Sequence, residues 1–351
     1  MARRAQHILL RNAKINKNDE FYTQLVDIER ELQHYCRAFE NKTVLCNCDD
    51  YRTSNFFRYF FENFKKLGLK RLISTCYKEQ KTDLFSQYVE ERATAADFCG
   101  NNGENGGEVH ITELRGDGDF RSDECIEILK DADIVVTNPP FSLFREYLAQ
   151  LIKYDKKFLI IGNINAITYK EVFKLIKENR IWVGVNYGRG ISGFIVPKEY
   201  ELYGTEARID EFGNRIISTN NCLWLTNIDH SQRHEYIPLT REFCGHESDF
   251  DTYDNFEGIN VDNTKDIPGD YDGAIGVPIT FLHRFNPEQF EIIKFRKGND
   301  GKDLSIKGKC PYFRILIRRK SLRPTQESNV NPHVPHAGAA DYGARPGTLT
   351  V

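Results

Sequence analysis

The fold is decided by the stretch Asp133-Ile-Val-Val-Thr-Asn138-Pro139-Pro140-Phe141. Its apolar residues predict a buried strand, which the two prolines end because proline fixes φ and lacks a backbone N–H. We expect Ser142 to cap a helix that follows directly. Asn138 then stands outside the carboxyl end of a central strand, where open α/β sheets bind their ligands.

Strand-like and helix-like stretches alternate on both sides of this segment. We expect strands at residues 44–48, 71–76, 109–114, 133–137, 158–161 and 181–185. Helices are expected from Ser54 to a stop at Gly68, over 122–130, after Ser142, and over 169–178. Residues 77–98 are expected to be helical or irregular. This alternation predicts an α/β fold with a doubly wound, mostly parallel sheet.

The pattern becomes β-rich after about residue 190, with a hairpin expected over 206–218 around the turn 211–214. Pro, Gly, His, Ser and Asn dominate the residues after 320, which predicts a disordered tail. We therefore expect a basic arm at 1–18, an α/β domain at 19–190, a β-rich substrate-recognition region at 191–320 and the tail at 321–351.

Charge is nearly balanced, with 48 basic and 51 acidic residues and a formal net charge of −3. The N-terminal segment departs from this balance, because its charged residues are all basic: Arg3, Arg4, Arg11, Lys14 and Lys17. Such an arm can grip phosphates or simply be a solvated chain end. No apolar run has membrane-spanning length and no signal peptide is recognisable, so we expect a cytoplasmic protein.

The nine cysteines include no C-x-x-C pair, which argues against a disulfide framework and a zinc ribbon. Cys46 and Cys48 are expected to be buried thiols. The stretch His230-Ser-Gln-Arg-His234 could suggest a metal site, but we recognise no third or fourth ligand for it. We therefore expect no metal.

The residues of the motif point to chemistry on an exocyclic amine. Asn138 Oδ1 and the Pro139 carbonyl, held by the rigid Pro139-Pro140 pair, could each accept one amine hydrogen while Phe141 stacks on a planar ring. The amine of adenine is a poor nucleophile, since its lone pair is delocalised into the ring. Two acceptors would aim that lone pair at an activated methyl donor.

Two other segments are candidates for the cofactor site. Residues 20–24 form an aromatic and polar cluster, which could equally be a capped helix start. Asp117 or Asp119 could accept the adenine amine of a cofactor, with Phe120 beside the ring, although an ordinary Gly-Asp turn explains the same residues.

The chain resembles the EcoRI adenine-specific DNA methyltransferase family over nearly all of residues 1–320. The resemblance is carried by residues 19–24, 46–50, 116–122, 133–145, 188–197, 200–210, 220–227 and 276–290. It implies a class I, Rossmann-like methyltransferase that acts as a monomer on N6 of adenine in GAATTC and protects DNA from a partner restriction endonuclease. S-adenosylmethionine would be the methyl donor and S-adenosylhomocysteine the product.

The resemblance also implies roles for individual residues. Asn138, Pro139, Pro140 and Phe141 match the family's catalytic motif. Phe21, Tyr22 and Thr23 match the segment that lies against the methionine end of the cofactor. Four residues stand where other methyltransferases have a glycine-rich cofactor loop: Cys46, Asn47, Cys48 and Asp49.

Duplex DNA adds two requirements. The target adenine must rotate out of the stack to reach the motif, and base edges must be read, typically by Arg, Asn or Gln. Candidate readers are Arg189, Asn220, Asn221 and Arg233. Three alternatives stay open: methylation of guanine N2 in RNA, methylation of a protein glutamine, and DNA binding without catalysis.

Overall fold

The computed structural model describes residues 22–78, 92–100, 107–186, 190–196, 202, 207–217, 221–296, 303–311 and 313–320. The basic arm and the tail therefore lie outside the described residues, as do Phe21, Arg189 and Asn220. Within the described part, no helix is long and apolar enough to cross a membrane.

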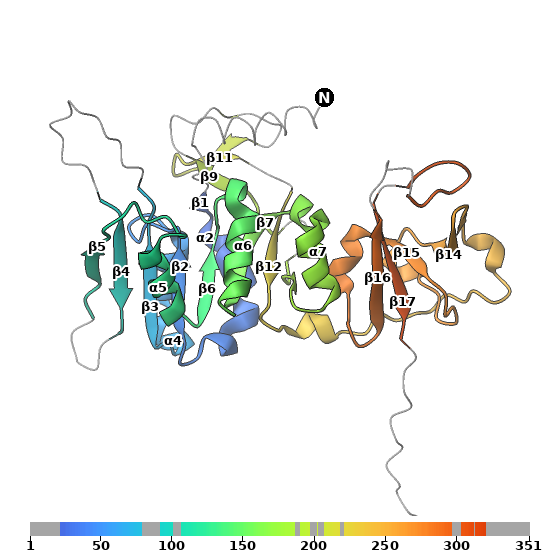
Figure 1. The fold of residues 1–351 in the computed structure, drawn as a ribbon, viewed down its shortest axis with the longest axis horizontal. Coiled ribbons are helices and arrows are strands. Elements are labelled where there is room, and N and C mark those ends of the chain that lie inside the picture. Colours follow the sequence, from blue (N-terminus) through green and yellow to red (C-terminus); the bar gives the residue numbers. More distant parts are fainter. Residues whose placement is uncertain are drawn as a thin grey trace, which may run out of the picture. The chain divides into compact units, whose positions relative to one another are not determined.

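An eight-stranded sheet forms the centre of the fold (Figure 1). In spatial order its strands are β5 (His110–Glu113), β4 (Thr94–Phe98), β3 (Arg71–Thr75), β2 (Thr43–Asn47), β6 (Ile134–Thr137), β7 (Lys157–Asn163), β12 (Cys222–Thr226) and β8 (Trp182–Val183). The strands β3, β2, β6 and β7 are mutually parallel. β4 runs antiparallel to β3 and β5, and β12 runs antiparallel to β7 and β8.

Helices cover both faces of this sheet. One face carries α2 (Leu25–Leu32), the 3-10 helix η1 (Gln33–Phe39), α3 (Asn55–Glu62) and α4 (Phe64–Leu67). The other face carries α5 (Asp123–Asp131), α6 (Phe144–Lys153) and α7 (Lys170–Lys177). Successive side chains of a strand point to opposite faces. In β2, Val44 and Cys46 accordingly pack towards α3, whereas Leu45 packs towards α6. The two-sided covering that the alternation predicts is thus present.

The expected helix from Ser54 to Gly68 is confirmed in its cap and its stop. The Ser54 hydroxyl accepts hydrogen bonds from the amides of Phe56 and Phe57, and Gly68 ends α4 with a left-handed φ of 63°. Asn63 divides the segment into α3 and α4. The phenylalanines of its apolar stripe are buried in the core: Phe56, Phe57, Phe60 and Phe64.

Two local expectations are wrong. Residues 94–98 form strand β4 rather than helical or irregular structure, because they pair between β3 and β5. Ser142 does not cap α6: Phe141–Leu143 form a 3-10 turn, η2, and Leu143 occupies the N-cap position of the helix. The Pro139-Pro140 pair therefore leads first into this tighter turn.

The residues after 190 contribute to three sheets. β12 lies in the central sheet, and β9 (Phe194–Val196), β11 (Arg215–Ile217) and β10 (Arg208–Ile209) form a four-stranded sheet with β1 (Tyr22–Thr23). β10 and β11 are the expected hairpin, with Gly213 at a φ of 81° in its turn. The boundary at 190 stays a prediction.

A five-stranded sheet completes the described fold. Its strands, in order, are β13 (Thr252–Tyr253), β14 (Phe256–Asn260), β15 (Ile275–Pro278), β17 (Arg314–Arg319) and β16 (Phe290–Arg296). It joins the core of the central sheet through α7, because Phe173 packs on Phe295 with ring centroids 5.0 Å apart. Short 3-10 helices connect the strands: η3 (Ile164–Thr168), η4 (Ser231–His234), η5 (Glu247–Asp249), η6 (Thr264–Asp266) and η7 (Ile279–Arg284).

Candidate functional site

The motif lies at the carboxyl edge of the central sheet, as the sequence predicts. Asn138 directly follows β6, Pro139 is buried, and the Pro140 carbonyl accepts a hydrogen bond from the Leu143 amide at 3.0 Å, which closes the η2 turn. The ring of Phe141 packs edge-on against Phe194 of β9, with centroids 6.1 Å apart. The four-stranded sheet therefore borders the motif, and Figure 1 shows β9 and β11 beyond the ends of the central strands.

The loop after β2 lies beside the motif. Asp49 is half-buried there, and its Oδ2 lies 2.6 Å from the hydroxyl of Thr137, the residue that precedes Asn138. Its Oδ1 accepts a hydrogen bond of 2.8 Å from the Ser54 hydroxyl at the start of α3. Burial raises the pKa of the Asp49 carboxyl to about 7, although the bonds from Thr137 and Ser54 act to lower it.

The loop after β2 contains no glycine. Cys48 adopts a φ of 65°, a left-handed conformation that normally favours glycine. The Asn47 side chain supports it, since Asn47 Oδ1 accepts hydrogen bonds from the Cys48 amide at 3.0 Å and the Thr75 hydroxyl at 2.7 Å. Cys46 is fully buried in the core on the α3 side. Asn47, Cys48 and Asp49 are thus the loop residues that stand at the carboxyl edge.

The segment before α2 approaches the same edge from the four-stranded sheet. Tyr22 and Thr23 pair with Ile195 and Phe194, and the Thr23 carbonyl accepts a 2.8 Å hydrogen bond from the Asn55 side chain at the start of α3. Thr23 is 4% exposed, and its hydroxyl has no partner among the described residues. A buried, unsatisfied hydroxyl is the kind of group that a bound ligand satisfies.

The loop at 116–120 lies against the end of β3, because the Asp117 carbonyl accepts a hydrogen bond from the Lys78 amide at 2.8 Å. Asp117 Oδ1 accepts the Asp119 amide at 3.0 Å. Both Asp119 carboxylate oxygens are engaged by Arg121, which lowers the pKa of Asp119. Phe120 is 3% exposed and packs edge-on to Tyr147 in the core. Among the described residues of this loop, Asp117 is the one whose carboxylate is not engaged by an arginine.

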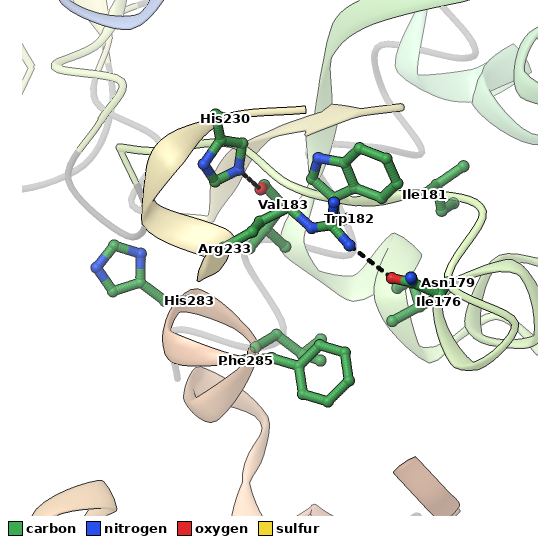
Figure 2. A pocket seen from close by; sticks show the side chains of 10 residues that line it. Ile176, Asn179, Ile181, Trp182, Val183, His230, Arg233, His283 and Phe285 are labelled. Carbon is green, nitrogen blue, oxygen red and sulfur yellow. Dashed lines mark hydrogen bonds between the residues drawn. The ribbon is translucent and has the colours of Figure 1, made fainter. Parts of the chain in front are cut away.

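The described DNA-contact candidates lie in different settings. Asn221 is half-buried at the start of β12, and its carbonyl accepts the Ile164 amide at 2.6 Å, next to the end of β7 and thus at the edge that carries the motif. Arg233 is 8% exposed. Its guanidinium lies over Trp182, 3.6 Å from the ring centroid, and donates to Asn179 Oδ1 at 2.6 Å. Figure 2 shows these three side chains.

Arg233 is also bonded to Asp229 at 2.7 Å. Its charge and its planar face are therefore both committed inside the fold, which corrects the expectation that it reads a base. The neighbouring histidines are engaged as well: His230 contacts the Val183 carbonyl, and His234 contacts Asp229 and Glu288.

Sequence reasoning missed the hydroxyls that hold the loop after β2. Thr137 and Ser54 contact the Asp49 side chain, and the Ser74 hydroxyl donates to the Asp49 carbonyl. A signal for them exists in the sequence, because Ser74, Thr75 and Thr137 are hydroxyl residues at the ends of strands that flank β2. Buried hydroxyls at that edge need partners: Ser74 donates to the Asp49 carbonyl, Thr75 donates to Asn47 Oδ1, and Thr137 contacts the Asp49 carboxyl.

The residues present fit a cofactor that carries a positive charge and amine groups. The Thr23 hydroxyl is unsatisfied among the described residues. In the same part of the chain, no Lys, Arg or His forms an ion pair with Asp49, whereas Arg52 and Lys78 both pair with its neighbour Asp50. A half-buried carboxyl without a cationic partner is available to a cationic ligand.

Comparisons with known proteins identify the family. A model of the family described as adenine-specific methyltransferase EcoRI matches residues 9–320. The chain is 63% identical over 325 residues to the type II methyltransferase M.EcoRI of Escherichia coli, covering 92% of this chain and 100% of that protein. It is 35% identical to M.MgeORF184P of Mycoplasma genitalium, covering 88% and 98%. It is 34% identical to M.MpnI of Mycoplasma pneumoniae, covering 88% and 97%.

No solved structure matches the chain significantly. The family match spans the central sheet, the motif after β6 and the other two sheets. The chain therefore belongs to the EcoRI family of adenine-specific methyltransferases.

Proposed function

We propose that this methyltransferase transfers the methyl group of S-adenosylmethionine to the N6 amine of an adenine in the duplex sequence GAATTC. The observation that carries the proposal is the position of Asn138-Pro139-Pro140-Phe141 at the carboxyl end of β6, directly beside the loop after β2. Its membership of an adenine-specific family supports the choice of base.

The sheet supports a class I, Rossmann-like arrangement. Four parallel strands lie at its centre, helices cover both faces, and the antiparallel β12 lies between β7 and β8. Ligands of such sheets bind outside the carboxyl ends of the strands. We assign the cofactor to Tyr22, Thr23, Asn47, Cys48, Asp49 and Asp117, which approach that edge.

In this mechanism the chain mainly positions an amine. S-adenosylmethionine, when bound, supplies a methyl group already activated for transfer. Asn138 Oδ1 and the Pro139 carbonyl accept the two amine hydrogens of adenine, which turns the nitrogen lone pair out of conjugation and towards that methyl group. Phe141 stacks on the base, and its contact with Phe194 holds the ring in place. No strong base is needed, because the proton can leave after transfer.

Access to the motif requires base flipping, at a cost of a few kcal/mol. We assign duplex recognition to residues 191–320, with Asn221 the described candidate at the catalytic edge. Arg3, Arg4, Arg11 and Lys14 would contact phosphates, which predicts salt-dependent affinity. We further propose that the enzyme acts as a monomer beside a restriction endonuclease of the same specificity.

Plasmid methylation tests the proposal. Purified protein, plasmid DNA and S-adenosylmethionine are incubated, and the plasmid is then challenged with an endonuclease that cuts GAATTC. N6-methyladenine with complete protection is the expected result. Methyladenine without protection would overturn GAATTC as the site. Unmodified DNA would overturn the proposal and direct the assay to RNA and protein glutamine substrates.

A further inference from the structure

Asp49, in the loop after β2, contacts three other elements at the carboxyl edge of the sheet. Its amide donates to the Thr75 carbonyl at 2.8 Å, and its own carbonyl accepts the Ser74 hydroxyl, so its backbone is fixed to the end of β3. Its carboxyl contacts Ser54 at the start of α3 and Thr137 at the end of β6. The side chain therefore has one defined position, in direct contact with the strand that leads into Asn138.

The contacts of the Thr137 hydroxyl favour a protonated Asp49 carboxyl. The Thr137 hydroxyl has one hydrogen, yet it lies 2.5 Å from the Asn47 carbonyl oxygen and 2.6 Å from Asp49 Oδ2. Both are hydrogen-bond distances, and a carbonyl oxygen cannot donate. Separate hydrogens fill both contacts when Thr137 donates to Asn47 and a protonated Asp49 donates to Thr137, whereas an ionised Asp49 has to accept from Thr137.

The same assignment follows at the other carboxyl oxygen. The Ser54 hydroxyl accepts from the Phe56 and Phe57 amides, so its hydrogen is available to Asp49 Oδ1. In the protonated arrangement Asp49 accepts one hydrogen bond and donates another. A neutral carboxylic acid satisfies both contacts, and burial favours that form.

The other titratable groups named here keep one protonation state around neutral pH. On β2 and its loop, burial raises the pKa of the Cys46 and Cys48 thiols well above their ordinary range. On α6, burial does the same to the Tyr147 phenol. Asp50 is held ionised by Arg52 and Lys78, because their bonds and charges lower its pKa despite partial burial.

Asp119, in the loop at 116–120, is likewise held ionised by Arg121. Cys125 of α5 stays a thiol, since burial raises its pKa. Of these groups and Asp49, Asp49 is the one whose pKa lies near 7.

We propose that Asp49 is a proton-linked selector for the charge of the cofactor: it is protonated in the free enzyme and loses its proton to solvent when the cationic methyl donor binds. This inference rests on the proposed cofactor. Once ionised, Asp49 can only accept hydrogen bonds, so the Thr137 hydroxyl turns its hydrogen from Asn47 to Asp49. The charge of the ligand thereby changes a bond at the residue next to Asn138.

The proposal explains how donor and product are distinguished. S-adenosylmethionine carries a sulfonium charge that S-adenosylhomocysteine lacks after transfer. An ionised Asp49 stabilises the first ligand electrostatically and gains less from the second. The site therefore returns to its protonated state as the product leaves.

Calorimetric titration in two buffers of different ionisation enthalpy measures the released protons directly. The proteins are the wild type and Asp49→Asn, whose amide can donate to Thr137 as the protonated acid does but cannot ionise. The ligands are S-adenosylmethionine and S-adenosylhomocysteine at pH 6 to 8. Subtracting the variant from the wild type removes protons that come from the ligand's own amine.

We expect the wild type to release about half a proton more than Asp49→Asn on binding S-adenosylmethionine at pH 7, and clearly less with S-adenosylhomocysteine. Its affinity for the donor should fall by up to about tenfold per pH unit below pH 7, relative to the variant. Equal proton release by the two proteins would overturn the inference and leave the proposed cofactor intact. Absence of donor binding in the wild type would instead contradict the proposed function.

A second variant keeps the test decisive if Asp49→Asn does not fold. Ser54→Ala removes the hydroxyl that donates to Oδ1 of the Asp49 carboxyl. Loss of this donor disfavours the ionised carboxyl, so the midpoint of proton release should shift to higher pH. An unchanged midpoint in a folded Ser54→Ala protein would overturn the inference.

Discussion

The hydroxyl of Thr137 lies 2.6 Å from the carboxyl of Asp49, which ties the end of β6 to the loop after β2. These two strands are parallel neighbours, with Val44 opposite Ile134 and Leu45 opposite Val135. The contact thus joins the loop that we assign to the cofactor and the motif that we assign to adenine. A substitution in one of these two segments should therefore alter ligand binding at the other.

Ser54→Ala should lower the free energy of unfolding by about 1 kcal/mol, because the hydroxyl caps α3. It should also change cofactor affinity, since Ser54 contacts Asp49. Ser122→Ala is the matched control: it removes the cap of α5, where the Ser122 side chain accepts only from the Cys125 amide. Urea unfolding and cofactor titration separate the effects. Equal affinity losses in both variants would contradict a special role for Ser54.

Asp49→Asn should stabilise the free protein at pH 8 but not at pH 4. The pKa of Asp49 is about 7 in the folded protein and 3.8 ordinarily. The folded state therefore favours the protonated carboxyl, and the stability that this proton contributes is full below pH 3.8 and is lost as pH rises through 7. The expected difference at pH 8 is on the order of 2 kcal/mol, discounted for partial exposure.

Urea unfolding of both proteins over this pH range measures the difference. The comparison isolates Asp49, because the depressed pKa of His230, about 4, changes stability equally in both proteins. A difference that does not vary with pH would rule out a raised pKa for Asp49.

Gly118→Ala should destabilise the loop at 116–120 by at least about 3 kcal/mol. Gly118 has a φ of 77°, and an added Cβ would lie 2.1 Å from the Cys76 carbonyl oxygen. Gly116→Ala is the control two residues away, since nothing lies within 4 Å of its Cβ position. Thermal unfolding should separate the variants clearly. Equal stability would show that the loop does not pack on Cys76 as described.

Arg233→Ala should lower stability by about 2 kcal/mol, because it removes a buried guanidinium that contacts Asp229, Asn179 and Trp182. The folded variant should keep its affinity for DNA. Arg58→Ala is a control on the surface. Among the described residues Arg58 pairs only with the exposed Glu62, so the stability of this variant should not change measurably. Loss of DNA affinity in a fully folded Arg233→Ala protein would show that Arg233 does contact DNA.

The central strands and helices could be predicted because their signals are local. Apolar runs such as residues 134–136, the cap at Ser54 and the stop at Gly68 each depend on a few neighbouring residues. β4 could not be predicted, since residues 94–98 lack a strong strand pattern and become a strand by pairing between β3 and β5. β12 likewise enters the central sheet from a distant part of the chain.

The motif could be predicted, but its neighbours could not. Asn138-Pro139-Pro140-Phe141 is recognisable as a local sequence at the end of a strand. The contact of Asp49 with Thr137 spans 88 positions, so only the parallel pairing of β2 and β6 brings the two residues together. Arg233 fails as a predicted DNA contact for a related reason, because its burial under Trp182 depends on tertiary structure.

The measurement that most directly tests methyl transfer to adenine by this motif is nucleoside mass spectrometry with a methyl-labelled donor. Wild type and Asn138→Ala are incubated with the same duplex, and binding of each protein to that duplex is measured in parallel. We predict labelled N6-methyladenine from the wild type, a rate at least about 100-fold lower for the variant, and DNA affinity largely unchanged. Labelled N6-methyladenine from Asn138→Ala at the wild-type rate would contradict the account.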